Sequence, residues 1–316
     1  MRQTLYFLIT VITSSLQAQP MSPLAGLPGS PMRMGFGSQG IGMGNAMVAT
    51  PTQTNMGYYN PALAAFQERP AATVAVGFLS LDRGLNFLNF STPLPPSAGL
   101  SLGIVNAGVS EIEGRDRDGR PTENHSTSEN TFFLSFGVRI DTNLVVGIST
   151  KILYYKLFTD MTSTTAGFDL GVIYRVTDEF TLGACLQDIG SKYKWDSSAL
   201  YGLEGTTSIE RFPVRKRIGV SYAPQVVPVL SALELEYTAG MTFLKLGVEV
   251  SPTNSFALRG GLDHLGLSES LAAKPSFGFS LQTATGAWQS SLSYAIVIEP
   301  YAPASLHLLA LGVEFR

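Results

Sequence analysis

From residue 71 onward, apolar and polar side chains alternate with a period of two, which is the pattern of β-strands. In TFFLSFGVRID, residues 131–141, the apolar side chains fall on one face, at Phe132, Leu134, Phe136, Val138 and Ile140. The segments SFALRGGLD and WQSSLSYAIVI, residues 255–263 and 288–298, repeat the alternation. Gly, Ser and charged residues of both signs occupy the opposite face. Residues 71–316 are therefore predicted to form an array of β-strands.

Turn signals divide this region into about fourteen strands. Their expected ranges are 71–82, 84–92, 97–110, 130–141, 143–158, 165–176, 178–190, 212–224, 229–239, 241–251, 255–264, 274–284, 287–298 and 304–316. Most of these ranges have about 10 to 14 residues, whereas strands of soluble proteins usually have about 5–6. Because a tilted strand crosses a membrane with about 9–11 residues, the predicted strands are long enough to span one.

The links between the predicted strands alternate in length. Every second link is tight, namely TPLPP, 141–143, 177–178, PQVVP, SPTN and ATGA, and the other set includes the long links at 114–130, 191–210 and 265–274. Short turns on one rim, longer loops on the other and an even strand count are typical of outer-membrane barrels with both termini in the periplasm. We therefore expect an all-β fold, a transmembrane antiparallel β-barrel, in the bacterial outer membrane. The alternative is a soluble β-sandwich, which would need more charge on its exposed faces.

The amino-acid composition argues against several classes of function. Only 14% of the residues are charged and the mean hydropathy is +0.17, whereas soluble domains carry about 25% charged residues. The net charge of −3, with no Lys before Lys151, argues against nucleic-acid binding. The single cysteine, Cys185, lies in an alternating apolar segment and the three His are scattered, so neither a catalytic thiol nor a metal site is expected. No Ser-His-Asp order or HExxH motif occurs, so we expect no enzyme and no cofactor.

The N-terminus has the pattern of a secretory signal peptide, which we assign to residues 1–19. Arg2 supplies the positive charge, residues 5–12 are apolar, and a small-residue stretch ends near Ala18. An amphipathic N-terminal strand or helix is the alternative. A signal peptide agrees with export to the outer membrane.

Residues 35–40 read GFGSQG, which has the Gly-x-Gly-x-x-Gly spacing of a dinucleotide-binding loop. Such a loop needs a strand before it, a helix after it and an acidic residue about 20 positions further on. Here Pro23, Pro28 and Pro31 precede the motif, further glycines follow it, and the stretch NMGYYNPALAAF contains no acid. We therefore expect these glycines to form a close-packed, irregular backbone that approaches other chain segments.

If the apolar faces of the strands contact lipid, the alternate faces line the lumen of the barrel. Charged residues on that phase are Arg139, Asp169, Arg175, Arg215, Arg217, Glu234, Glu236, Glu249, Arg259, Asp263 and Glu314. They carry both signs and lie on neighbouring strands. They form either an ion-pair network between the strands and a plug, or the lining of a polar permeation or ligand path.

Residues 20–70 precede the strand array and are too apolar and Gly-rich for a solvated tail. A lumen of about fourteen strands is too wide for wall side chains alone to fill, so we expect this segment to form an N-terminal hatch inside it. The run GIGMGNAMVATPTQTNMGYYNPALAAF, residues 40–66, resembles the N-terminal signature of the PorV/PorQ family, which is related to FadL-type barrels. The residues that carry the signature are Gly40, Gly42, Gly44, Ala46, Tyr59, Asn60, Pro61 and Ala62.

Later segments also resemble this family, at 168–190, 217–222, 244–263 and 275–281. The resemblance implies a FadL-like barrel with a hatch and a role in type IX secretion or in cell-surface attachment of secreted proteins. Its partners would then be a large translocon or attachment protein and the secreted cargo, besides the outer-membrane lipid.

Most loops of this chain are compact, however, and only residues 111–129 and 191–211 are long enough to grip a protein. The alternative function is therefore a FadL-like passive transporter of hydrophobic small molecules, and a purely structural barrel is a third possibility.

Overall fold

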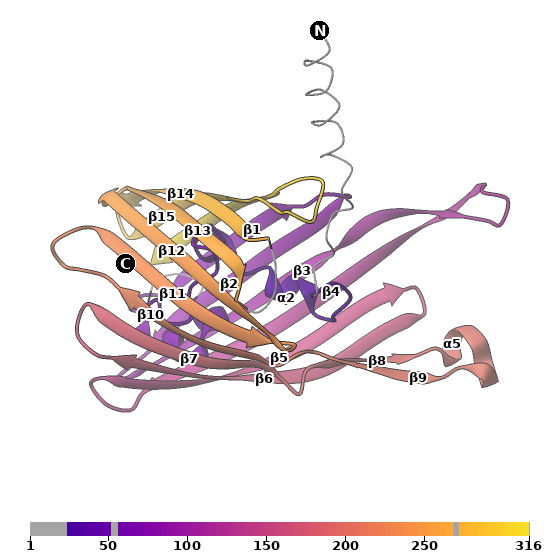
Figure 1. Ribbon diagram of the computed structural model, residues 1–316, viewed down its shortest axis with the longest axis horizontal. Helices are drawn as coiled ribbons and strands as arrows, with labels where there is room; N and C mark the ends of the chain where they lie inside the picture. The colour runs from indigo at the N-terminus through magenta and orange to yellow at the C-terminus, as the bar shows by residue number, and fades with distance from the viewer. Residues whose placement is uncertain (1–23, 52–55, 268–271, 316) are drawn as a thin grey trace, which may run out of the picture.

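The computed structural model describes residues 24–51, 56–267 and 272–315, and the expected signal peptide, residues 1–19, lies outside these ranges (Figure 1). The described part of the chain consists of a strand barrel, hairpins that extend from one of its rims, and short helices inside it. Among the described helices, none is long and apolar enough to cross a lipid bilayer.

The barrel strands of the described residues number fourteen and are antiparallel, which confirms the predicted fold. They are β1 (Ala71–Phe78), β2 (Arg83–Leu94), β3 (Ala98–Arg115), β4 (Pro121–Arg139), β5 (Leu144–Phe158), β6 (Met161–Arg175), β7 (Phe180–Ile189), β10 (Arg215–Tyr222), β11 (Val229–Thr238), β12 (Met241–Thr253), β13 (Phe256–Gly266), β14 (Lys274–Thr285), β15 (Trp288–Val297) and β16 (Leu306–Phe315). Each overlaps one expected range. Neighbours in the chain are neighbours in the barrel, with β10 next to β7.

Closure removes the edges of the sheet, because β1 pairs with β2 on one side and with β16 on the other over its whole length. In the apolar core of a bilayer, an unpaired backbone N–H or C=O has no water to bond, so only a closed sheet is stable there. On β4, Phe132 and Leu134 are exposed, whereas their neighbours Thr131 and Ser135 are buried. The alternation in the sequence thus separates a lipid-facing wall from the lumen.

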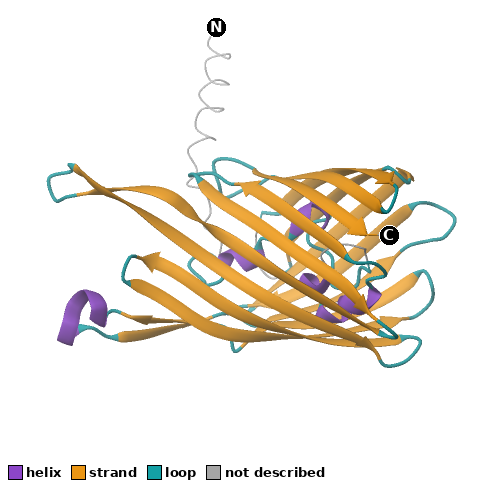
Figure 2. Cartoon of the chain, turned by 180° about the vertical axis from the view of Figure 1, so that it is seen from behind, coloured by secondary structure: helices purple, strands orange, loops and turns teal. Residues whose placement is uncertain are grey.

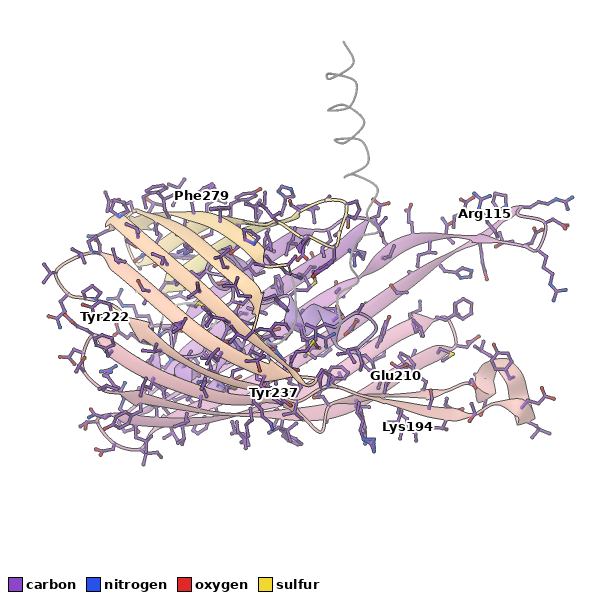
Figure 3. The ribbon with its side chains drawn as sticks, viewed as in Figure 1. Arg115, Lys194, Glu210, Tyr222, Tyr237 and Phe279 are labelled. Atoms are coloured by element: carbon purple, nitrogen blue, oxygen red, sulfur yellow. The ribbon has the colours of Figure 1, made fainter. Side chains whose placement is uncertain are left out.

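Residues 111–129, expected to be a long loop, are mostly strand in the structure. β3 continues to Arg115 and β4 begins at Pro121, with register shifts along the pair. The turn between them is held by Asp116, whose carboxylate accepts a hydrogen bond from the Arg120 N–H at 2.9 Å. The segment is rich in charged residues and contains Gly and Pro, which suggested a loop. Outside the membrane, however, a ladder can expose polar side chains on both faces. We call residues 111–129 the β3–β4 arm (Figures 1 and 3).

Residues 191–211, also expected to be a loop, form a second projecting hairpin. It contains β8 (Lys192–Asp196), α5 (Ser198–Tyr201), a 3-10 turn (Gly202–Glu204) and β9 (Thr207–Arg211). Figure 2 shows the short α5 helix at its tip, beyond the barrel. At its base, Tyr193 and Trp195 are buried in a cluster that includes Met32, which precedes the barrel. We call residues 191–211 the β8–β9 arm.

The segment before β1 lies inside the barrel as short helices (Figure 2). These are α2 (Ser30–Arg33), α3 (Gly37–Gly42), α4 (Met56–Tyr59) and η2 (Pro61–Phe66). The glycine run that was expected to be irregular therefore forms a helix, α3. Away from water, buried backbone groups must be hydrogen-bonded, and a helical turn provides those bonds within the segment, as from Met43 N–H to Gln39 O at 3.0 Å.

Candidate functional site

We use the name hatch for the described residues before β1, 24–51 and 56–70. Asn60 joins this segment to the barrel wall. It is fully buried at the start of η2, where its Oδ1 accepts a hydrogen bond from the Ala62 N–H at 3.1 Å. Its Nδ2 donates to Val48 O within the hatch at 2.9 Å and lies 3.2 and 3.3 Å from Val172 O and Ala184 O of the wall. A side chain that bonds both the hatch and two barrel strands fixes the position of the hatch. Pro61 is buried at the first position of the same 3-10 helix.

Tyr59 occupies the centre of the hatch. Its hydroxyl accepts a hydrogen bond from the Phe36 N–H at 2.8 Å and lies 2.8 Å from the Asn45 Oδ1. Burial raises the pKa of Tyr59 above its usual value, so the phenol stays neutral. Gly40 faces the ring closely, because a Cβ at that position would lie 2.2 Å from the Tyr59 oxygen. The Gly40 and Tyr59 of the sequence signature are therefore in contact.

The other small residues of the signature differ in how tightly they pack. Gly44 has a φ of +60°, and a Cβ there would lie 2.6 Å from the Leu262 nitrogen of β13. At Gly42 a Cβ would have only an ordinary contact of 3.5 Å with Gly278. Ala46 is 1% exposed and belongs to the same apolar cluster as Tyr59. Gly44 is thus the position at which the backbone itself requires glycine.

A buried cluster of charges faces the hatch from β10 to β13. Arg217 pairs with Glu234 at 2.6 Å and Arg215 pairs with Glu236 at 2.7 Å. Lys245 bridges Glu236 and Asp263, at 2.8 and 3.4 Å. The cluster balances three cations against three carboxylates. We call these six residues, Arg215, Arg217, Glu234, Glu236, Lys245 and Asp263, the central charge cluster.

The central charge cluster also binds the backbone of the hatch. The Glu234 carboxylate accepts hydrogen bonds from the N–H groups of Met47 and Val48, at 3.0 and 2.9 Å. Arg217 donates to Asn45 O at 3.2 Å and to Tyr59 O at 3.1 Å. A buried charge is stable only where its hydrogen-bonding groups are satisfied, and the hatch backbone supplies part of these hydrogen bonds. The same contacts hold the hatch between the charged strands.

The remaining predicted lumen charges lie outside this cluster. Asp169 pairs with Lys151 at 2.8 Å, and Glu249 pairs with Arg259. Arg139 and Arg175 place their guanidinium groups 5.7 and 5.2 Å from the centroid of the Phe66 ring, and Glu314 pairs with Arg69 at the rim, at 3.4 Å.

Sequence reasoning missed Lys151, Lys245 and Asp188. Lys151 and Lys245 follow the inward phase of β5 and β12, so the alternation that identified the other charges also marks these two. Asp188, which pairs with Lys151 at 2.8 Å, has a φ of +64°, and no periodic pattern marks it.

Two adjacent cavities lie between the hatch and the barrel wall, at the end of the barrel that carries the long links. Their volumes are about 250 and 230 Å³. Both are lined by Ser30 and Met34 of the hatch, by Leu79 of the β1–β2 link and by Arg83, the first residue of β2. The lining of both is mixed, with apolar side chains from the hatch and wall and a few charged groups. We call them the loop-side cavities.

On the lipid-facing side of the wall, β6, β7, β10 and β11 form an apolar groove of about 450 Å³. Gly183 and Gly219 lie in its floor, and on the lumen side of both glycines stands Val48 of the hatch. A Cβ at Gly219 would lie 2.7 Å from a methyl group of Val48. At this place only two side-chain-free residues of the wall separate an apolar hatch residue from the bilayer.

These features define an outer-membrane β-barrel whose lumen contains the segment that precedes its first strand. Solved structures of this class are similar to the chain. The Ralstonia pickettii toluene transporter TbuX matches with a TM-score of 0.63 and 12% identity over 89% of this chain and 98% of that chain. The Pseudomonas putida toluene transporter TodX has a TM-score of 0.61 and 12% identity over 89% and 97%, and a Pseudomonas aeruginosa FadL homologue 0.61 and 10% over 88% and 97%.

At these identities the likeness shows the fold, a FadL-type barrel. No family model matches the sequence, and no curated protein matches it. The resemblance to PorV/PorQ proteins rests on the sequence motifs alone.

Proposed function

We propose that this protein is a passive transporter of hydrophobic small molecules across the outer membrane. The observation that carries this function is the pair of loop-side cavities above the hatch. The second of them is lined by Pro31, Met34, Leu79, Leu85 and Val109, which offer apolar surface to a ligand. The solved structures with a similar fold are described as toluene transporters and monoaromatic hydrocarbon channels, which supports the same class of substrate.

The size of the cavities fits a single aromatic ring. An apolar cavity of about 150 Å³ binds benzene, and each loop-side cavity exceeds that volume, at 250 and 230 Å³. Ligand pockets usually combine apolar walls with a few polar groups that orient the ligand. In the second cavity, Thr127 and Glu129 supply such groups. The substrate class we propose is therefore a small aromatic or similarly compact apolar molecule.

A route from these cavities requires the hatch to move. Val48 lies on the lumen side of Gly183 and Gly219, with the lipid-facing groove on their other side. In the proposed route, a shift of Val48 and its neighbours opens a path past the hatch for a substrate that prefers apolar surroundings. The proposed activity is the movement of a substrate from one phase to another, and it involves no catalytic step.

Cellular uptake of labelled toluene tests this function. Ala107 is buried on the lumen face of β3 and lines the second cavity, so Ala107→Phe fills the space that the substrate needs. Ala166→Phe, on the lipid-facing side of β6, is the matched control with the same substitution. We expect Ala107→Phe to lower uptake several-fold and Ala166→Phe to leave it unchanged. Equal uptake by both folded variants would refute the proposed function.

A second candidate function, secretion or surface attachment of proteins, is favoured by the two projecting arms. The β8–β9 arm carries exposed apolar side chains at its tip, with Tyr201 65% and Leu203 fully exposed. Exposed apolar side chains on a projecting element are typical of protein contact sites. For this function we expect that replacing residues 197–206 by a short turn releases cargo from the cell surface and abolishes co-purification with a translocon. Unchanged surface display would exclude it.

A further inference from the structure

A third cavity lies at the opposite end of the lumen, at the rim of the short links and the C-terminus. Its volume is about 430 Å³, within the range of small-molecule sites, which are usually about 300–1,000 Å³. The hatch contributes Ser38, Gln39 and Pro51 to its lining, and the remaining walls come from β1 and from β11 to β16 with their links. Because both termini of such barrels lie in the periplasm, this cavity faces the periplasm. We call it the periplasmic cavity.

The wall of the periplasmic cavity contains a block of small hydrogen-bonding side chains. Ser280 and Gln282 of β14 stand directly opposite Ser293 and Ser291 of β15. All four residues line the cavity. Their hydroxyl and amide groups can each donate and accept hydrogen bonds, so the block offers both kinds of partner to one ligand.

Arg259 provides a buried donor that the protein does not use. The residue is 8% exposed, its Nε pairs with Glu249, and its Nη2 donates to Ser280 Oγ at 2.9 Å. Its Nη1 has no hydrogen-bond partner among the described residues. A buried polar group without a partner is costly and rare, and it calls for an explanation. Arg259 lines the periplasmic cavity, but Nη1 is itself buried, so a small turn of the guanidinium toward the cavity is needed before an acceptor atom of a ligand can complete its hydrogen bonds.

We propose that the periplasmic cavity binds a neutral, polyhydroxylated molecule of the size of a monosaccharide. The charges around the cavity are already balanced, since Arg259 pairs with Glu249 and Glu314 pairs with Arg69. A neutral ligand therefore fits better than an anion. Its hydroxyl groups bond the serine and glutamine block and Arg259 Nη1.

Occupation of this site is expected to act on the hatch as well. Gln39 of α3 donates a hydrogen bond to the Glu249 carboxylate at 2.9 Å, and the same carboxylate pairs with Arg259. A ligand that orders Arg259 thereby also orders the contact between α3 and the wall. The site is distinct from the loop-side cavities and does not depend on the transport function proposed for them.

The experiment uses full-length protein in a detergent without a sugar headgroup, with D-glucose as the probe and D-gluconate as its anionic counterpart. Saturation-transfer NMR and a titration measure binding. We expect glucose to bind in the millimolar range. Arg259→Lys keeps the charge opposite Glu249 but removes the Nη1 donor, and it should raise the Kd about tenfold, which is the size of one hydrogen bond to a charged group.

The matched pair Ser291→Leu and Ser290→Leu controls for folding. Ser291 lines the cavity and Ser290 lies next to it on the exposed face of β15. Loss of glucose binding in Ser291→Leu with normal binding in Ser290→Leu supports the site. Three results would overturn it: no glucose binding to the wild type, binding of gluconate alone, and glucose binding that neither Arg259→Lys nor Ser291→Leu weakens.

Discussion

The Glu234 carboxylate is the group whose loss should release the hatch most specifically. Its Oε1 pairs with Arg217 Nε at 2.6 Å, and its Oε2 accepts the two hatch N–H groups of Met47 and Val48. Glu234→Gln keeps the shape of the side chain but replaces one oxygen by an NH2 group. Whichever way the amide turns, a donor then faces either the Arg217 guanidinium or the two hatch N–H groups.

The free energy lost in Glu234→Gln can be worked out from these contacts. A buried group left without its partner costs about 1–3 kcal/mol, and breaking a buried charge pair costs about 3–5 kcal/mol. A loss of about 3 kcal/mol in the free energy that holds the hatch closed raises the open population more than about a hundredfold, since each 1.4 kcal/mol is a factor of ten. We therefore expect amide hydrogen exchange in residues 34–50 to accelerate by about that factor, as measured by mass spectrometry on the purified barrel.

The control for this prediction is Glu314→Gln. Glu314 also lies on the lumen phase, but its partner Arg69 is 48% exposed at the rim, and exposed ion pairs contribute only about 0–1 kcal/mol. Exchange in the hatch should stay at the wild-type rate in this variant. If Glu234→Gln accelerates exchange no more than Glu314→Gln does, the central charge cluster does not hold the hatch.

Three further predictions concern the hatch. Gly44→Ala should lower the yield of assembled, heat-modifiable barrel, because a Cβ there meets the Leu262 nitrogen at a φ of +60°, whereas Gly42→Ala should assemble normally; equal yields would refute this. Asn60→Ala should expose the hatch to protease within an intact barrel, through loss of about 1–3 kcal/mol, and wild-type resistance would contradict it. Val48 and Cys185 belong to the same small buried cluster, so oxidised Val48→Cys should form a disulfide with Cys185 and lose toluene uptake until reduced. A Cys185→Ala background is the control, and unchanged uptake in the cross-linked protein would exclude hatch movement.

The barrel could be predicted from the sequence because lipid imposes a regular pattern on it. Each spanning strand alternates in side-chain character, so side-chain chemistry repeats every two residues and marks the strands directly. The two arms were misjudged because this constraint ends at the membrane surface. Residues 111–129 continue the ladder of β3 and β4 with polar side chains on both faces, and nothing in their composition separates such a strand from a loop.

The candidate site was predictable only in part. The inward phase identified Arg217, Glu234 and Asp263, but it could not show which charges meet, since pairing depends on the stagger of neighbouring strands. Arg139 and Arg175 share that phase, yet both face the ring of Phe66 instead of a carboxylate in the central charge cluster. The conformation of the hatch was not predictable either, because its short helices are fixed by contacts with the wall and not by a periodic pattern.

The central charge cluster also determines what kind of space an open lumen would be. If the hatch left the barrel completely, Arg215, Arg217 and Lys245 with their three carboxylates would face the vacated space, and water would enter to hydrate them. A hydrophobic molecule gains nothing by entering a hydrated, ion-lined pore. For such a substrate the favourable movement is a small one, which opens a gap beside Val48 while the charges stay covered. The same residues that fasten the hatch thus make a partial displacement more useful for transport than a full one.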